Sequence, residues 1–307
     1  VEWLGHVTSI DRSALPLSMQ ANLPDWLLDR FTAQWGAEEA MQVAESLNRP
    51  APLDLRVNTL KTTRDAATLA LTEAGVTAES TPFAALGLRL AKKPALQNMP
   101  LFKEGAIEVQ DEGSQLLAQI LGAKRGEMVV DFCAGGGGKT LALGAAMRNT
   151  GRLYAMDTSA HRLDGLKPRL ARSGLSNVHP VAIAHERDDR IKRLSGKIDR
   201  VLVDAPCSGL GTLRRSPDLK WRQSPEGVQA MSVQQNAILD SAARLLKPGG
   251  RLVYATCSTM LEENEAVAQA FSQRHPQWMP QSVQDALTEL KVEQAAQLCG
   301  DDGMYLR

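Results

Sequence analysis

The chain has 307 residues, of which 43% are hydrophobic and 23% are charged, as is usual for a globular protein of one or two domains. Lys+Arg and Asp+Glu balance at 35 each, so no overall charge demands a nucleic-acid or membrane partner, and any basic surface must be local. Four cysteines without a C-x-x-C pair exclude a disulfide framework and argue against zinc, and no apolar run is long enough to span a bilayer. We therefore expect a cytoplasmic protein with free thiols, no metal and no membrane partner.

Residues 1–50 are predicted to form a helical lead-in. Pro24 opens a helix whose apolar face continues through Phe31 and Trp35. A second helix is predicted from about Glu38 to Leu47, before Pro50.

Residues 51–112 are predicted to form a small α+β domain. Leu53–Val57 alternates apolar and polar residues like a strand, and Thr63–Ala74 is typical of a helix closed by Gly75. Short strands are predicted near Val76, Leu88 and Ile107.

Residues 113–307 alternate between strand and helix patterns. The predicted strands are Met128–Val130, Leu153–Met156, Val178–Ile183, Ile198–Val203 and Arg251–Tyr254. The predicted helices are Ser114–Leu121, Thr140–Met147, Ala160–Arg172, Gly227–Leu246, which Pro248-Gly249-Gly250 ends, and Glu262–Arg274. Gly303–Arg307 is predicted to begin a final strand. Repeated βα units predict a parallel, doubly wound sheet of the α/β class.

A glycine-rich turn, Asp131-Phe132-Cys133-Ala134-Gly135-Gly136-Gly137-Gly138-Lys139-Thr140, joins the first of these strands to its helix. Such a turn lets a ligand approach the backbone closely. A nucleoside-triphosphate loop would use Gly138-Lys139-Thr140, with Val201–Asp204 as a magnesium-binding strand, but Cys133 stands where its first glycine belongs. A dinucleotide fingerprint matches only at Gly135 and Gly137, because Thr140 holds its third position.

The third interpretation of the turn is an S-adenosylmethionine site. There an acid ends the first strand, and a second acid after the next strand accepts hydrogen bonds from the ribose hydroxyls; Asp131 and Asp157 hold those places. Asp157 is alternatively a helix N-cap, a role that Thr158 or Ser159 would otherwise take.

Two cysteines follow predicted strands, Cys207 in Asp204-Ala205-Pro206-Cys207-Ser208-Gly209 and Cys257 in Tyr254-Ala255-Thr256-Cys257-Ser258. Ligands of open α/β sheets bind outside the carboxyl ends of the strands, so these thiols indicate nucleophilic chemistry at one crevice. Cys133 and Cys299 are instead predicted to pack as small hydrophobic side chains.

These motifs, in this order, resemble the Sun (Fmu) family of RNA cytosine carbon-5 methyltransferases. The resemblance covers roughly residues 24–275 and rests on the glycine turn, on both cysteine motifs and on these further segments: Arg56-Val57-Asn58-Thr59, Val109-Gln110-Asp111, Asp157 with Arg162, Arg215–Trp221, Gly249-Gly250 and Glu262-Glu263-Asn264. It implies a Rossmann-like class I methyltransferase sheet with a smaller N-terminal α+β domain that is RRM-like and binds RNA.

The resemblance also implies the roles of the site residues. Cys257 is the nucleophile, Cys207 assists adduct breakdown and release, and Asp204 contacts the base. The implied S-adenosylmethionine ligands are Cys133, Ala134, Gly135, Gly136, Gly137, Gly138, Lys139, Asp157, Arg162, His185 and Asp204. The implied substrate is RNA, ribosomal RNA ahead of transfer RNA, and a monomer is expected. A catalytically inactive RNA-binding assembly factor is the non-enzyme alternative.

Two departures from the family pattern bear on the cofactor. The family's turn has Ala and Pro where this chain has Gly135 and Gly136, which predicts a more flexible loop. The family's acid near the adenine is replaced by His185-Glu186.

Basic residues flank the Cys207 motif and are candidates for phosphate contacts, namely Arg187, Arg190, Lys192, Arg193, Arg214, Arg215, Lys220 and Arg222. Trp221 is either a base-stacking residue or, by a small margin, a core or hinge residue.

Overall fold

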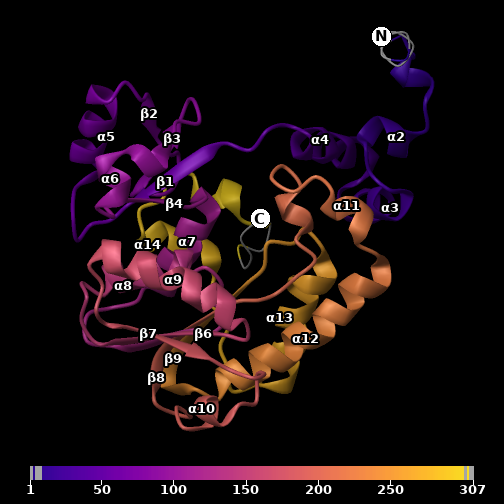
Figure 1. Cartoon of the computed structure of the whole chain (residues 1–307). Coiled ribbons are helices and arrows are strands. Elements are labelled where there is room, and N and C mark those ends of the chain that lie inside the picture. The colour runs from indigo at the N-terminus through magenta and orange to yellow at the C-terminus, as the bar shows by residue number, and fades with distance from the viewer. Residues whose placement is uncertain (1–2, 4–8, 301–302, 304–307) are drawn as a thin grey trace. The chain divides into compact units, whose positions relative to one another are not determined.

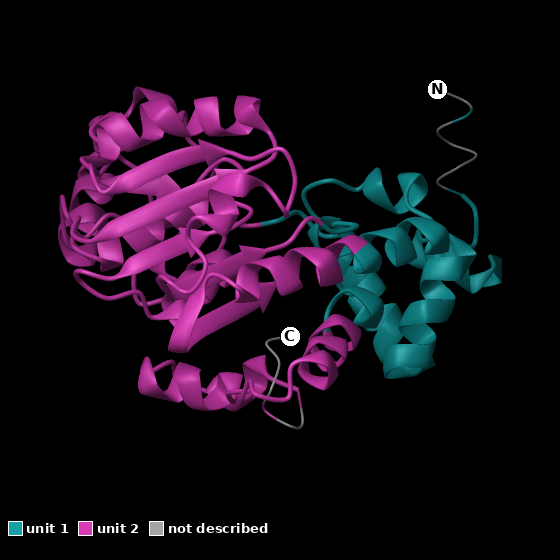
Figure 2. Cartoon of the chain, turned by 90° about the horizontal axis from the view of Figure 1, so that it is seen from below, with its two compact units in different colours: residues 1–51, 207–233, 256–264 teal, residues 52–206, 234–255, 265–307 magenta. Residues whose placement is uncertain are grey.

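A computed structural model describes residue 3, residues 9–300 and residue 303 (Figure 1). The chain forms two compact units that are interleaved in sequence (Figure 2). The first contains residues 1–51, 207–233 and 256–264, and the second contains residues 52–206, 234–255 and 265–307.

The first unit is helical and is built from three separate segments of the chain. Its elements are η1 (Arg12–Ala14), α2 (Leu17–Ala21), α3 (Asp25–Trp35), α4 (Ala37–Leu47), η3 (Leu210–Thr212), α11 (Leu219–Arg222), the start of α12 (Pro225–Ala243) and η4 (Leu261–Glu263). Leu27 and Phe31 of α3 and Ala40 and Ala44 of α4 are buried, in one apolar cluster with Leu210 and Met260 from the later segments. The two predicted N-terminal helices are therefore confirmed, and they form a core with both cysteine-bearing segments.

The second unit begins with a four-stranded antiparallel sheet in the order β2-β3-β1-β4. The strands are β1 (Leu53–Val57), β2 (Ala78–Ser80), β3 (Gly87–Leu90) and β4 (Ile107–Val109). Helix α5 (Arg64–Glu73) is capped by Thr63 and packs Ala67 and Leu71 against this sheet, while η2 (Leu96–Asn98) and α6 (Pro100–Lys103) lie before β4. The predicted small α+β domain is confirmed.

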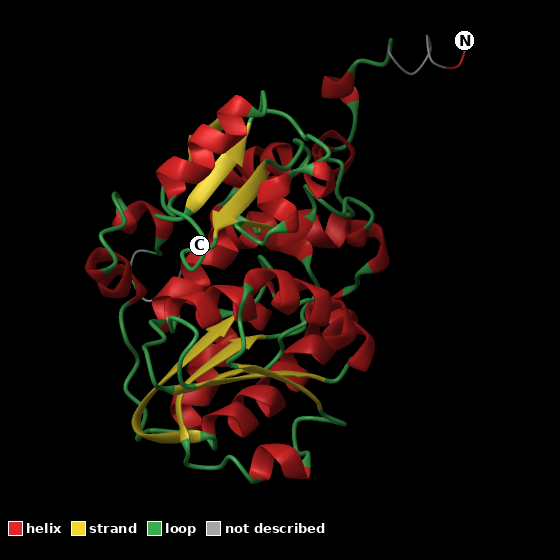
Figure 3. Cartoon of the chain, turned by 60° about the vertical axis from the view of Figure 1, so that its left-hand side comes forward, coloured by secondary structure: helices red, strands yellow, loops and turns green. Residues whose placement is uncertain are grey.

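The second unit also contains a parallel sheet with helices around it (Figure 3). This sheet has five strands in the order β7-β6-β5-β8-β9. Its strands are β5 (Met128–Asp131), β6 (Arg152–Asp157), β7 (Val178–Ala182), β8 (Ile198–Asp204) and β9 (Leu246–Ala255). The order reverses between β5 and β8, and ligands of doubly wound sheets bind at this switch point.

Helices cover both faces of the parallel sheet, so its strands are apolar on both sides. One face packs against α7 (Glu112–Leu121), α8 (Gly138–Ala146) and α9 (Ala160–Ser173). The other packs against α10 (Asp189–Lys192), the end of α12 and α13 (Glu265–Arg274). The predicted Rossmann-like architecture is confirmed.

Three predicted boundaries are wrong or lie outside the structure. Helix α12 ends at Ala243, and Leu246 already pairs with Ile198, so Pro248-Gly249-Gly250 forms a bulge inside β9 rather than the end of a helix. The last predicted helix begins at Glu265, after the 3₁₀ turn η4. Residues 304–307 of the predicted final strand lie outside the described residues.

The tail contains two helices that the sequence did not indicate, α14 (Val283–Glu289) and η5 (Ala295–Leu298). Leu287 and Ala295 are buried with Leu116 and Ile120 of α7, and Cys299 packs beside them, as predicted for that cysteine. Within the described residues, no helix combines the length and the apolarity that crossing a membrane requires.

Candidate active site

Three acids end neighbouring strands of the parallel sheet, Asp131 on β5, Asp157 on β6 and Asp204 on β8. In a parallel sheet the carboxyl ends of all strands meet at one edge, so these side chains concentrate negative charge beside the glycine turn. The acids at Asp157 and Asp204 both raise the pKa of Asp131 by repulsion, which reflects how near the three are.

Asp131 is 1% exposed, and one of its carboxylate oxygens accepts a hydrogen bond of 2.7 Å from Thr140 Oγ1. The other oxygen has no partner among the described residues. Burial raises the pKa of Asp131 to about 7, although the Thr140 hydrogen bond opposes the shift. An unpaired buried acceptor at a switch point is a place where a ligand can donate a hydrogen bond.

Asp157 is held by the backbone in a way the sequence left open. One carboxylate oxygen accepts from the Gly135 amide at 2.8 Å, and the other accepts from the Ser159 amide at 2.7 Å. Ser159 Oγ accepts from the Arg162 amide and caps α9, so the capping alternative belongs to Ser159. Each Asp157 oxygen keeps a second lone pair with which to accept from a ligand.

The glycine turn bends through two residues in the left-handed region, Gly135 at φ 54° and Gly137 at φ 79°. A Cβ on Gly137 would lie 2.2 Å from Leu166 Cδ1 of α9, so α9 presses directly on the turn. Gly138 begins α8, which points its N-terminus at the turn.

Lys139 and Thr140, which a triphosphate loop would use for phosphate and magnesium, are both engaged by carboxylates. Lys139 Nζ lies 2.6 Å from Asp204 Oδ2, and Thr140 bonds to Asp131. Three acids at this edge disfavour a triphosphate and favour a cationic ligand, which argues against the triphosphate interpretation.

The remaining candidate cofactor residues fall into two groups. Cys133 packs against the apolar core and Ala134 is 9% exposed, and burial raises the pKa of the Cys133 thiol, so that thiol packs rather than reacts. Arg162 and His185 have exposed side chains, and His185 Nδ1 accepts from the Arg187 amide.

Gln110 is a further candidate for cofactor binding. It lies in the Val109-Gln110-Asp111 segment of the family resemblance, for which no role was predicted. Its side-chain oxygen accepts from Arg56 Nε at 2.6 Å, whereas its buried side-chain nitrogen has no partner among the described residues. That nitrogen lies 3.8 Å from the position that a Cβ on Gly138 would take. The site near the turn therefore offers a ligand one unpaired buried donor, on Gln110, and one unpaired buried acceptor, on Asp131.

The two candidate catalytic cysteines meet in the first unit. The sulfurs of Cys207 and Cys257 lie 3.3 Å apart, and Cys257 is the more exposed. The hydrogen bond with Cys257, and secondarily burial, raise the pKa of Cys207, so Cys207 keeps its proton at neutral pH. The pair therefore contains one protonated donor and one exposed sulfur.

Glu263 joins the two cysteine loops and is fully buried. It accepts from the Ser208 amide at 2.8 Å and from the hydroxyls of both Ser208 and Ser258, each next in sequence to a cysteine. The Gly211 amide adds a hydrogen bond of 3.0 Å to the Cys257 carbonyl. Sequence reasoning missed this role of Glu263. The Glu262-Glu263-Asn264 segment belongs to the family resemblance, but the sequence does not distinguish the buried acid from the partly exposed one.

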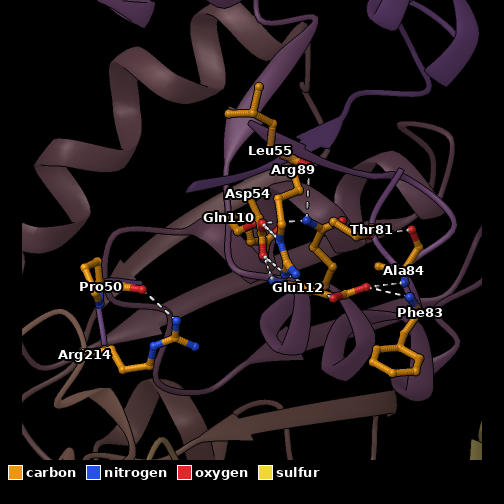
Figure 4. Close-up of polar contacts among 11 residues, drawn as sticks. Pro50, Asp54, Leu55, Thr81, Phe83, Ala84, Arg89, Gln110, Glu112 and Arg214 are labelled. Carbon is orange, nitrogen blue, oxygen red and sulfur yellow. Dashed lines mark hydrogen bonds and ion pairs between the residues drawn. The ribbon is translucent and has the colours of Figure 1, made fainter. Parts of the chain in front are cut away.

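The basic residues after Cys207, which the sequence offered as candidates for phosphate contacts, differ in their surroundings. Arg214 donates to the Pro50 carbonyl (Figure 4). It also donates to the Arg49 carbonyl. Lys220 is 4% exposed, and burial lowers its pKa. Trp221 is 60% exposed beside the Lys220 ammonium, so the core role predicted for it is wrong.

No group of three His, Cys, Asp or Glu side chains in the described part of the chain is arranged to hold a metal ion. The doubly wound sheet, the glycine turn after β5 and the acids after β5, β6 and β8 together define a Rossmann-like methyltransferase domain.

The chain belongs to the family of the 16S rRNA methyltransferase RsmB/F, whose model matches residues 118–306. The ferredoxin-like domain of the same RsmF/B-like proteins matches residues 23–97. The family is one of S-adenosylmethionine-dependent methyltransferases.

Curated relatives carry the name ribosomal RNA small subunit methyltransferase B. A probable one from Synechocystis sp. is 38% identical and covers 88% of this chain, and one from Erwinia tasmaniensis is 35% identical and covers 92%. The chain spans 60% and 65% of their respective lengths.

Two solved structures share the fold. A methyltransferase homologue from Pyrococcus horikoshii is 33% identical with a TM-score of 0.76, over 86% of this chain and 83% of that one. The NSun6 protein of the same organism, with SFG, has a TM-score of 0.75 at 22% identity, over 82% of this chain and 87% of that one.

Proposed function

We propose that the protein is an S-adenosylmethionine-dependent RNA cytosine-5 methyltransferase that acts on ribosomal RNA through a covalent adduct. The observation that carries the proposal is the 3.3 Å approach of the Cys207 and Cys257 sulfurs, on loops that follow the adjacent strands β8 and β9. The names of the relatives support ribosomal RNA as the substrate.

The residues around the glycine turn fit the cofactor. S-adenosylmethionine supplies a methyl group on a positively charged sulfonium, together with an ammonium, a carboxylate and a ribose diol. The unpaired Asp131 oxygen suits a cationic donor, and the unpaired Gln110 nitrogen suits a carboxylate. Asp157 has lone pairs left for the ribose hydroxyls, so the ammonium, the carboxylate and the ribose diol each have a complementary group at the turn.

Cys257 is assigned as the nucleophile because it is the more exposed sulfur. Its thiolate adds to carbon-6 of cytosine, which makes carbon-5 an enamine carbon nucleophilic enough to take the methyl group. Loss of the carbon-5 proton then expels the Cys257 thiolate and restores the aromatic ring. Asp204 contacts the base at its pairing edge and shares a proton with it there, while the Lys139 ammonium beside Asp204 offsets the negative charge that develops as the thiolate adds.

Cys207 is assigned to adduct breakdown. Because its pKa is raised, it remains a thiol at neutral pH and donates a hydrogen bond to the departing Cys257 sulfur. A sulfur that accepts such a bond is a better leaving group, so Cys207 speeds product release.

Trapping with RNA that contains 5-fluorocytosine tests these roles, because fluorine at carbon-5 blocks the final elimination. Cys257→Ala should form no adduct. With ordinary cytosine RNA, Cys207→Ala should accumulate adduct that the wild-type protein releases. Equal trapping by both variants would contradict the assignment, and bisulfite mapping of cellular RNA would distinguish ribosomal from transfer RNA.

A further inference from the structure

The glycine turn needs support from outside itself. Gly135 to Gly138 are consecutive glycines, which lose more backbone entropy on ordering than any other residues. Proline at such a position would fix the backbone without any partner, whereas glycine leaves it free. This chain must therefore hold the turn by contacts.

Helix α9 supplies those contacts. Leu166 fills the space beside Gly137. One turn later, the Arg169 guanidinium donates to the Gly136 carbonyl through Nη1. Asp157 accepts a hydrogen bond from the Gly135 amide. Three successive glycines are therefore each contacted by a different side chain, two through hydrogen bonds and Gly137 through packing.

The orientation of the Arg169 side chain is fixed by hydrogen bonds to a residue of the small domain. Glu108 on β4 is 4% exposed, and its Oε2 accepts from Arg169 Nη2 at 2.7 Å and from Nε at 3.2 Å. Its Oε1 accepts from Arg172, one turn further along α9, at 2.9 Å from Nε. Two guanidinium forks on one buried carboxylate leave Arg169 few alternative orientations.

We propose that Arg169 is a positioning residue for the cofactor turn, and that it does by hydrogen bonding what proline would do by covalent geometry. Through Glu108, the small domain then contributes to cofactor affinity although it lies outside the turn. The inference rests on the proposed function, because it takes the Gly135–Gly138 turn as the cofactor site.

The test is calorimetric binding of S-adenosylhomocysteine to the full chain. Arg169→Gln should weaken binding about tenfold, the loss expected when a charge-assisted hydrogen bond is removed. Arg169→Lys should weaken it similarly, because an ammonium cannot bridge Glu108 and Gly136 as a fork does. Lys167→Gln is the matched control, since it removes one positive charge from α9 at a side chain that pairs only with Asp164 on the surface.

Rescue distinguishes positioning from general stability. In the Arg169→Gln background, Gly136→Pro should restore affinity to within about threefold of wild type, by removing the flexibility that Arg169 restrains. Two observations favour this replacement: the Gly136 φ is not positive, and its amide donates no hydrogen bond among the described residues. Gly136→Ala is a milder second rescue, expected to restore part of the loss.

A ligand-free measurement completes the design. Amide hydrogen exchange of residues 133–140 should quicken in Arg169→Gln and slow again in the proline double variant. Glu108→Gln should weaken binding in the wild-type background but add little to Arg169→Gln. Unchanged affinity in Arg169→Gln, or a loss that neither replacement of Gly136 recovers, would overturn the inference. A wild-type protein that binds no S-adenosylhomocysteine would instead contradict the proposed function.

Discussion

At the scale of single residues, buried acids do two different jobs. Asp131 has an unpaired oxygen and a raised pKa, so it is unsatisfied until a ligand arrives. Glu263 is equally buried, but the groups that it binds come from both cysteine loops. The first acid keeps an acceptor for a ligand, and the second holds together the two loops that carry the proposed catalytic cysteines.

Asp131 predicts a pH dependence. Because its folded pKa of about 7 exceeds the ordinary 3.8, the free energy of unfolding should fall as pH rises from about 4 to about 7. The ligand's ammonium binds the ionised form, and S-adenosylhomocysteine keeps that ammonium, so its affinity should rise about tenfold per pH unit below pH 7 and level off above it.

Calorimetric titration of S-adenosylhomocysteine between pH 5.5 and 8.5 would check this, with Asp131→Asn as the control that cannot ionise. A wild-type affinity as independent of pH as that of Asp131→Asn would show that Asp131 does not titrate on binding.

Glu263 predicts a separation between cofactor binding and adduct formation. Glu263→Gln should cost about 1–3 kcal/mol of stability, because several buried donors lose a charged acceptor. It should slow trapping by 5-fluorocytosine RNA and leave S-adenosylhomocysteine affinity unchanged.

Glu262→Gln is the neighbouring control, since Glu262 pairs with the half-exposed Arg30 and should cost less than about 1 kcal/mol. Urea unfolding and adduct yield measure the two effects. Equal losses of stability and adduct yield in the two variants would show that Glu263 does not hold the two cysteine loops together.

At the scale of elements, the sequence predicted most of the strands and helices because their apolar periodicity is regular. It failed where tertiary pairing overrides local signals, as in Pro248-Gly249-Gly250, whose turn residues lie inside β9 as a bulge. The tail helices were missed because residues after His275 show no clear period.

The candidate site was predictable to a similar extent. Each cysteine and acid lies in a short motif, so local sequence located them. Contacts such as that of Arg169 with Gly136 join residues far apart in the chain. Neither segment contains a local pattern that predicts its partner, so these contacts could not be predicted from the sequence.

The glycine turn gives a prediction at this scale. Gly137→Ala should cost several kcal/mol and abolish measurable cofactor binding, because φ is 79° and the new Cβ would meet Leu166 at 2.2 Å. Gly75→Ala has a similar φ of 75° with open space around it, so only the backbone strain of about 1 kcal/mol should appear. Urea unfolding compares them, and equal losses would mean that Leu166 moves aside freely.

At the scale of the whole molecule, the small domain and the parallel sheet belong to one compact unit. The buried Asn58 side chain donates to the carbonyls of Gly105 and Ser173, and so ties the small domain to the end of α9. Within the small domain, Arg89 bridges Asp54 and Glu112 (Figure 4).

This connection predicts that the two domains unfold together. Asn58→Ala should cost about 2–3 kcal/mol, since it leaves two buried carbonyls with one partner fewer, and it should separate the transitions of the two domains. The exposed Asn98→Ala should change neither. Hydrogen exchange along a denaturant series would detect the separation, and unchanged cooperativity in Asn58→Ala would show that other contacts suffice.

The interleaving of the two units also constrains the order of events during synthesis. Residues 1–51 are made before their apolar partners at Leu210 and Met260, which follow more than 150 residues later. The apolar core of the helical unit therefore stays incomplete while the chain between its three segments is translated. The sulfurs of Cys207 and Cys257 can meet only after all five strands of the parallel sheet have been made, because Cys257 follows the last of them, β9, in the chain.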